Sequence, residues 1–204
     1  MWASRTLNLA RKTFGVCWLN DNDRTQLIIV DKYFLVCASV VAVVGAICDA
    51  RSRRIPNRLT LTALAVGLFV RGAVEGWSGL GGAIVASLVA GGFFFVFFLA
   101  GGMGGGDVKL ISAVGAWAGT SKVIPVLVAA GIAGGCLAGY YLIVDGGVGR
   151  TLRNTAVLMR HHLSVGLRPH SQINVQQSTL TRVPFGLAIA MGTLFCAGSA
   201  FLRR

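Results

Sequence analysis

Apolar residues fill most of this chain in long blocks that are separated by shorter polar segments. A hydrophobic helix needs about 20 residues to cross the hydrocarbon core of a bilayer. Most of the blocks approach or reach that length. The pattern therefore predicts an all-α, polytopic membrane protein with about six transmembrane helices, at residues 33–49, 57–73, 80–100, 107–119, 123–144 and 183–202.

The segments around these spans complete the predicted organisation. The spans 57–73 and 107–119 are short, so we expect them to include flanking residues, with Arg71 reaching back to the membrane interface. Residues 1–31 mix basic and acidic side chains and are predicted to form a flexible or surface-lying basic extension. Residues 32–204 would form the membrane domain. Its one long polar connection, 145–182, fits either an amphipathic interfacial helix or a disordered loop.

The composition excludes an ordinary soluble domain, because 54% of the 204 residues are hydrophobic and only 13% are charged. The formal net charge is +12, but the basic residues are spread over short connections and chain ends. We therefore predict contact with anionic lipids and no nucleic-acid partner. The five cysteines form no CxxC pair, and no histidine lies at ligand spacing from them. Neither a disulfide framework nor a metal site is predicted, and no cofactor is expected.

Two of the seven acidic residues, Asp49 and Asp107, lie at the boundaries of apolar spans. Charged groups at membrane depth are costly and are functional candidates by default. A chain that leaves the first span at Asp49 crosses the membrane twice before it reaches Asp107, so both carboxylates are expected on one face. Asp145 would lie on that face too. However, the glycines before Asp107 let the backbone bend sharply and approach a bound chain.

Paired carboxyl groups can activate water. Two such groups a few ångströms apart do not both ionise readily, so one holds a proton while the other is charged. The charged member would take a proton from water and the acid would polarise a peptide carbonyl. Because a helix dipole favours an anion at its start, Asp107 is predicted as the resting base and Asp49 as the resting acid. The alternative is local pairing of Asp49 with Arg51 or Arg53, and helix capping by Asp107.

The stretches around both aspartates resemble the prepilin peptidases, or type IV leader peptidases, which are membrane aspartic proteases of the GxGD type. One matching motif is D-x-R-x-R-x-I-P-N, from Asp49 to Asn57, and another is GxGD from Gly104 to Asp107, followed by Val-Lys-Leu. A weaker third match is Pro-aromatic-Gly, at residues 184–186. The two aspartate motifs are specific in combination, in this order and two spans apart. The resemblance covers residues 33–202.

The resemblance implies a membrane-embedded aspartic endopeptidase with Asp49 and Asp107 as its catalytic pair. It implies a bacterial inner membrane protein with its active site on the cytoplasmic side. The substrate would be a prepilin, a hydrophobic helix with a short basic leader, and the pilus assembly machinery a further partner. The chain is similar to the compact members associated with tight-adherence (Flp) pili. The residues implied to support the motifs or the substrate loop are Gly104, Gly106, Lys109, Pro56, Asn57, Pro184 and Gly186.

Longer members of that family carry a cysteine-pair domain and also N-methylate the new terminus. This chain has no CxxC pair, so the resemblance does not imply methyltransferase activity. Lysine and arginine are enriched in the cytoplasmic connections of membrane proteins. Their positions in this chain place the two aspartates on the cytoplasmic side only when the connections between spans are counted, because both chain ends would put basic residues on the opposite side of the membrane.

Two other classes of function fit the same aspartates. A small transporter or channel would use them as proton or cation sites, and activity on a peptide without ion flux separates this class from a peptidase. A non-catalytic subunit of a secretion machine would only pair them with arginines. Such a subunit should tolerate replacement of each aspartate by glutamate, whereas a cleavage dyad should not.

Overall fold

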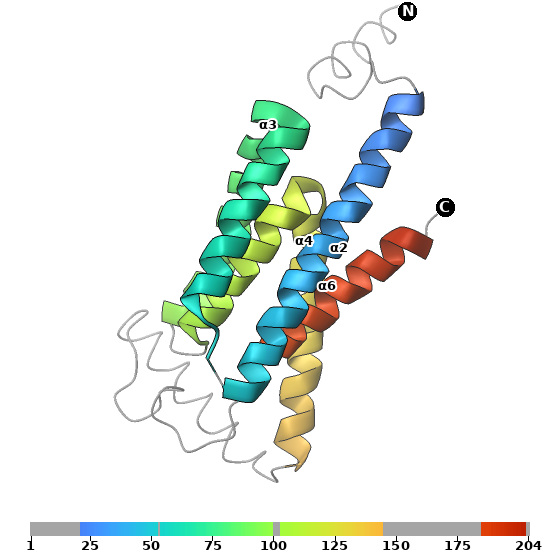
Figure 1. Ribbon diagram of the computed structural model, residues 1–204. Helices are drawn as coiled ribbons and strands as arrows, with labels where there is room; N and C mark the ends of the chain where they lie inside the picture. The colour runs from blue at the N-terminus through green and yellow to red at the C-terminus, as the bar shows by residue number, and fades with distance from the viewer. Residues whose placement is uncertain (1–20, 53, 100–102, 145–184, 203–204) are drawn as a thin grey trace, which may run out of the picture. The chain divides into compact units, whose positions relative to one another are not determined.

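The computed structural model describes residues 21–52, 54–99, 103–144 and 185–202. The secondary structure of these residues consists of four helices: α2 (Asp21–Ser52), α3 (Asn57–Leu99), α4 (Gly105–Val144) and α6 (Phe185–Leu202) (Figure 1). The all-α prediction is confirmed for this part of the chain. Two compact units divide the chain, residues 1–33 and 34–204. Helix α2 begins at Asp21, inside the predicted extension, and the connection 145–182 lies outside the described residues.

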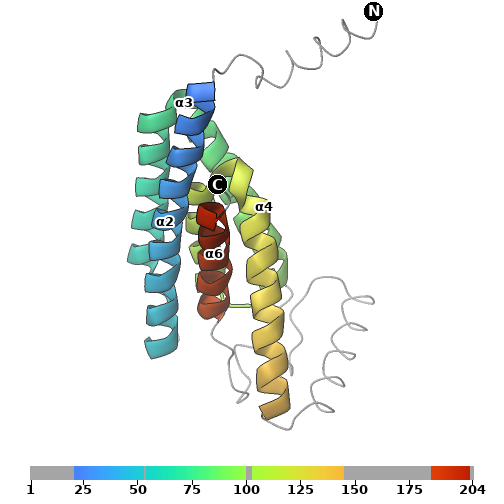
Figure 2. The ribbon, with the colours of Figure 1, turned by 90° about the vertical axis from the view of Figure 1, so that its right-hand side faces the viewer.

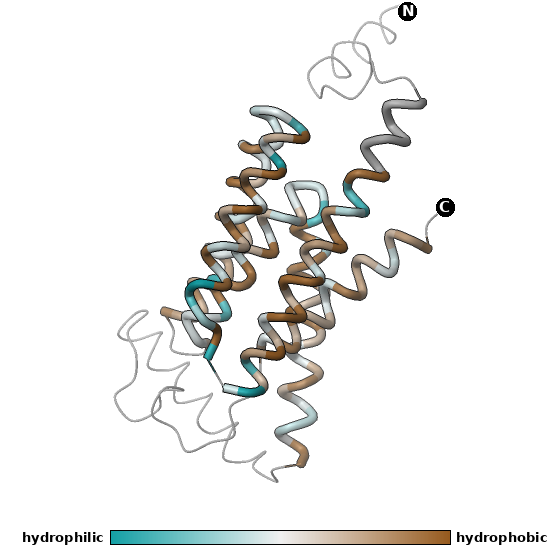
Figure 3. The backbone as a smooth tube through the Cα atoms, viewed as in Figure 1, coloured by the Kyte–Doolittle hydropathy of each residue, from teal (hydrophilic) through white to brown (hydrophobic). Residues whose placement is uncertain are grey.

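All four helices are long and apolar enough to cross a membrane, over Ile29–Ser52, Asn57–Leu99, Gly105–Tyr141 and Phe185–Leu202. In Figure 3 hydrophobic positions dominate these helices, and polar positions gather at the end of α2 and the start of α3. The predicted number of six spans is not confirmed. Two pairs of predicted spans each fall within one helix, because a kink joins them where the sequence suggested a separate connection.

Each of the two long helices changes direction at a single glycine. Gly76 in α3 has φ 68° and ψ −155°, and Gly119 in α4 has φ 70° and ψ 175°. Residues with a Cβ atom are almost excluded from this backbone region. Figures 1 and 2 show both helices as two limbs that meet at a bend. Beside the bend of α3 the limbs are in contact, because a Cβ on Gly72 would lie 3.5 Å from Leu80 Cβ.

These glycines provide a matched pair of substitutions. Gly76→Ala adds a methyl group that meets no atom within 4 Å, whereas the methyl group of Gly119→Ala would lie 2.7 Å from the Arg71 guanidinium. Both should lose about 1–3 kcal/mol of stability to backbone strain, and Gly119→Ala should lose more because it also displaces Arg71. Thermal unfolding in detergent measures the difference. Equal losses for the two variants would show that displacing Arg71 costs no additional stability.

Small residues allow the helices of the second unit to pack closely. Ala86 and Ala90 of α3 are fully buried, and a methyl group on Gly115 of α4 would lie 2.8 Å from Ala86 O and from Ala90 Cβ. Gly192 of α6 packs in the same way on the backbone of Ala130 in α4. Such close backbone approach drives helix association in a bilayer, where lipid is as apolar as the side chains. The first limb of α4 therefore packs on α3 and its second limb on α6.

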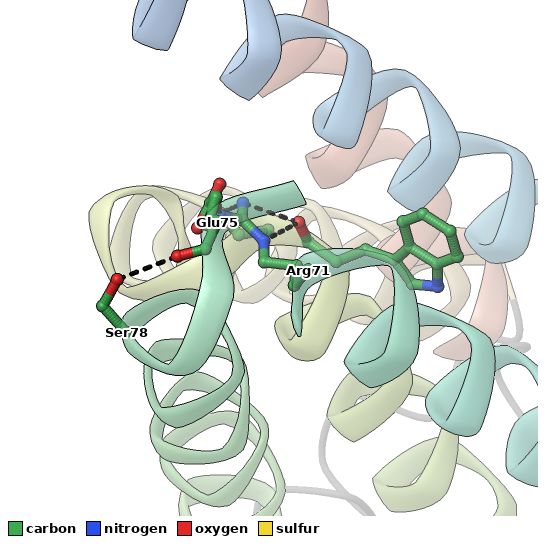
Figure 4. A network of polar contacts seen from close by, with 5 residues as sticks. Arg71, Glu75 and Ser78 are labelled. Atoms are coloured by element: carbon green, nitrogen blue, oxygen red, sulfur yellow. Dashed lines mark hydrogen bonds and ion pairs between the residues drawn. The ribbon is translucent and has the colours of Figure 1, made fainter. Parts of the chain in front are cut away.

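The Arg71 side chain packs inside the protein, so the prediction that it extends outward to the membrane interface is wrong. The residue is 5% exposed, and its Nε and Nη2 donate to Trp117 O at 3.2 and 2.9 Å (Figure 4). Nη2 also donates to Ala118 O at 3.1 Å, and Nη1 pairs with Glu75 Oε1 at 2.7 Å. The reason is that the first limb of α4 ends at Gly119, so its last carbonyl groups need donors from elsewhere. A guanidinium supplies several donors in one plane.

Aromatic side chains complete the surroundings of Arg71. Its guanidinium carbon lies 4.1 Å from the centre of the Phe34 ring, within the range of a cation–π contact. The Trp117 ring lies 6.2 Å from the same ring, and Trp117 Nε1 donates to Ala63 O at 2.8 Å. Helices α2, α3 and α4 are therefore joined at this end of α4's first limb.

Candidate active site

Asp49 lies three residues before the end of α2 and is half-buried. Its Oδ2 accepts a hydrogen bond from the backbone N–H of Gly186 at 3.1 Å. Helix α2 ends just beyond, where Ser52 Oγ lies 2.7 Å from Cys48 O and 3.0 Å from Arg54 O. Among the described residues no ion pair joins Asp49 to an arginine. Pairing with Arg51, one of the two local alternatives for Asp49, is therefore not what the structure shows, and Arg53 lies outside the described residues.

Asp107 lies in the first turn of α4 and is also half-buried. Its backbone N–H donates to Gly104 O at 3.2 Å, which closes a tight turn in the glycine segment. A Cβ on Gly104 would lie 3.2 Å from Asp107 Oδ2, so the glycine leaves space beside the carboxylate. The other oxygen, Oδ1, is buried and has no hydrogen-bond partner among the described residues. A buried acceptor in this state is costly unless a proton, water or ligand satisfies it.

The structure brings the two aspartates near each other although they are 58 positions apart in the sequence. Asp49 is close enough for its charge to act on the carboxyl group of Asp107. Two contacts support this arrangement: Leu110 of α4 fills the space beside Gly45 of α2, and Ile55 lies against Gly106. These contacts place the end of α2 and the residues that follow it beside the start of α4.

A hydrogen bond also links the two aspartate motifs. Lys109, in the first turns of α4, donates from Nζ to Asn57 Oδ1 at 2.9 Å, and Asn57 is the first residue of α3. Pro56 precedes it, and its carbonyl oxygen accepts from Thr60 N at 3.4 Å. The contact places the beginnings of α3 and α4 side by side.

Loss of the Lys109–Asn57 contact should have a small effect. Both residues are exposed, and a hydrogen bond between such groups contributes about 1 kcal/mol. Asn57→Ala and Lys109→Met should each lower the unfolding temperature by about 2–4 °C, and the double variant should fall no further than the poorer single one. Losses that simply add would show that the two side chains act independently.

Sequence reasoning did not foresee the partners of the glycines. Ile55 beside Gly106, and the Phe98 ring 3.3 Å from a Cβ on Gly105, form the surroundings of the glycine segment. Many glycines in one segment indicate that other groups pack closely against its backbone, but the sequence does not identify those groups. Pro184 and Asp145 lie outside the described residues. Among the described residues no cluster of three or more His, Cys, Asp or Glu side chains could hold a metal ion.

Comparison with known proteins gives one match. The family described as the type IV leader peptidase family matches residues 35–139, more than half of the chain. The matched range includes both aspartates and ends before α6. No curated protein and no solved structure matches the chain. The family match, together with the two aspartate motifs on membrane helices, shows that the chain belongs to the type IV leader peptidase family.

Proposed function

We propose that the chain is a membrane-embedded aspartic endopeptidase of the GxGD type, which removes the short basic leader from prepilins at the cytoplasmic face. The observation that carries this proposal is the position of Asp49 and Asp107. Two carboxyl groups from distant segments lie within electrostatic range of each other, and one oxygen of Asp107 has no partner among the described residues. A pair of carboxyl groups at such close range is suited to activate a water molecule.

The proposed reaction needs only the pair and water. The charged carboxylate takes a proton from water, the resulting hydroxide attacks the peptide carbonyl carbon, and the protonated partner donates to the carbonyl oxygen. Collapse of the tetrahedral intermediate breaks the C–N bond and transfers a proton to the leaving amine. The proton is assigned to the pair and not to either residue, because two carboxyl groups this close titrate together.

The glycine segment before α4 explains how a peptide would reach the pair. Gly104 is exposed and a side chain there would crowd Asp107 Oδ2, so an extended backbone can approach without obstruction. Peptide bonds within a helix already have their N–H and C=O groups engaged. The cleaved bond would therefore lie in the extended leader of the prepilin, while its hydrophobic helix packs against the membrane spans.

The basic residues near the pair favour a cytoplasmic location. Three exposed arginines lie in the last turn of α2, in the connection and in the first turn of α3: Arg51, Arg54 and Arg58. Such a cluster suits the anionic headgroups of the cytoplasmic leaflet of a bacterial inner membrane. The proposed setting is a tight-adherence (Flp) pilus system, with the pilus assembly machinery as a partner. The sequence contains no CxxC pair, and the proposed activity is peptide cleavage without N-methylation.

Co-expression with a prepilin in bacterial membranes tests the proposal. We expect a shift of the pilin to lower mass and a new N-terminus at the leader boundary, both absent when the peptidase is omitted. The same membranes, reconstituted into vesicles, should show no proton or cation flux above empty vesicles. Ion flux without cleavage of any prepilin would favour the transporter class instead.

A further inference from the structure

Asp49 is held in place by a helix that lies 137 positions away in the sequence. Helix α6 begins at Phe185, and a helix start leaves its first amide groups without partners inside the helix. One of these amides, the N–H of Gly186, donates to Asp49 Oδ2 at 3.1 Å. Gly186 is buried, so little water can replace this bond.

The absence of a side chain at position 186 permits this contact. A Cβ there would lie 3.1 Å from both Cβ and Oδ2 of Asp49, and 3.3 Å from Ala46 Cα. These separations are shorter than ordinary van der Waals contact, so any larger residue would push Asp49 away. Here the glycine is required by close approach and not by its backbone conformation.

Helix α6 is itself fixed on the helix that carries Asp107. The Phe185 ring packs on Phe94 of α3 with centroids 5.4 Å apart. Its edge occupies the space beside Gly134 of α4, where a Cβ would lie 2.7 Å away. Further along α6, Gly192 packs on the backbone of α4. The amide of Gly186 is therefore held in place through α3 and α4.

We infer that Gly186 is a positioning residue for the proposed reaction: its amide, held by α6 on α4, sets the place and orientation of Asp49 relative to Asp107. This inference rests on the proposed function of the pair. Reactions between positioned groups are sensitive to displacements of an ångström or less. Removing the amide or adding a side chain should thus slow the chemical step without changing how the prepilin binds.

Gly186→Ala in the full chain, assayed in membranes with a prepilin substrate, tests the inference. We expect kcat to fall about 10- to 100-fold and KM to stay within about twofold, which is the pattern for loss of an interaction used only in the transition state. The matched control is Gly198→Ala in the same helix, where a Cβ meets nothing within 4 Å. Its kcat and KM should equal those of the wild type.

A variant that only destabilises the fold would lose activity in a different way. In Gly192→Ala the methyl group overlaps the backbone of Ala130, so this variant should lose folded protein, and its active fraction should fall together with its unfolding temperature. A backbone ester in place of the Gly186 amide keeps the glycine and removes only the N–H. The ester should lower kcat about tenfold, the loss expected for one hydrogen bond to a charged group, with KM unchanged, even where the alanine variant folds poorly.

The inference is overturned if both the alanine and the ester variants keep wild-type kcat, or if KM rises as much as kcat falls. Asp49→Asn in the same assay separates this failure from failure of the proposed function. Cleavage that persists in Asp49→Asn contradicts the proposed function. An inactive Asp49→Asn beside a fully active Gly186→Ala contradicts only the positioning role.

Discussion

Asp49→Asn and Asp107→Asn are each expected to reduce prepilin cleavage by about 10²- to 10⁴-fold or more, the range that general acid–base catalysis contributes. Asparagine has nearly the shape of aspartate but can neither take a proton from water nor donate one as an acid. The loss should be similar in the two variants, because the remaining carboxyl group cannot fill both roles. The measurement is the rate of pilin processing in membranes that contain equal amounts of inserted peptidase.

Asp145→Asn is the control for this experiment, because Asp145 is the third acidic residue that the sequence places on the same face. It should process the pilin at the wild-type rate. Asp49→Glu and Asp107→Glu extend the comparison: they keep the charge but move the carboxyl group by one methylene, so a cleavage dyad should lose most of its activity. Wild-type processing by either asparagine variant would show that the aspartate is structural.

Arg71→Met is expected to cause the largest loss of stability, about 3–5 kcal/mol. The side chain is 5% exposed and satisfies Trp117 O, Ala118 O and the Glu75 carboxylate. Methionine fills a similar volume but leaves the half-buried Glu75 carboxylate and two buried carbonyl groups without their donor. The loss should appear as a lower midpoint of thermal unfolding in detergent and a smaller amount of inserted protein.

Arg58→Met is the matched control, since Arg58 is exposed near the start of the same helix. It should unfold within about a degree of the wild type, because surface charges contribute little. Arg71→Lys should fall between the two, since a lysine keeps the charge but lacks the planar set of donors that reaches several acceptors. Equal unfolding midpoints for Arg71→Met and Arg58→Met would contradict a structural role for the buried guanidinium.

The fold class and the two candidate aspartates could be predicted from the sequence because both depend on short-range features. Long apolar blocks need a lipid environment wherever they pack, and a carboxylate at the edge of such a block is unusual in any fold. The number of separate spans was less certain. A connection and a kink look alike in composition, and only the backbone angles at Gly76 and Gly119 distinguish them.

The partners of individual side chains depended on the tertiary structure. Arg71 follows an apolar run, a place where arginines commonly reach the interface, yet its acceptors lie 46 and 47 positions away on α4. The amide that holds Asp49 comes from Gly186, 137 positions away. The hydrophobic pattern and the motif spacing alone thus determined that this protein is helical and membrane-bound, and that two aspartates at the ends of its apolar segments are its candidate catalytic residues. Only the packing of the helices decided which backbone groups bind Arg71 and Asp49. Each of these contacts joins segments far apart in the sequence, and a local sequence pattern does not show which distant segments come together.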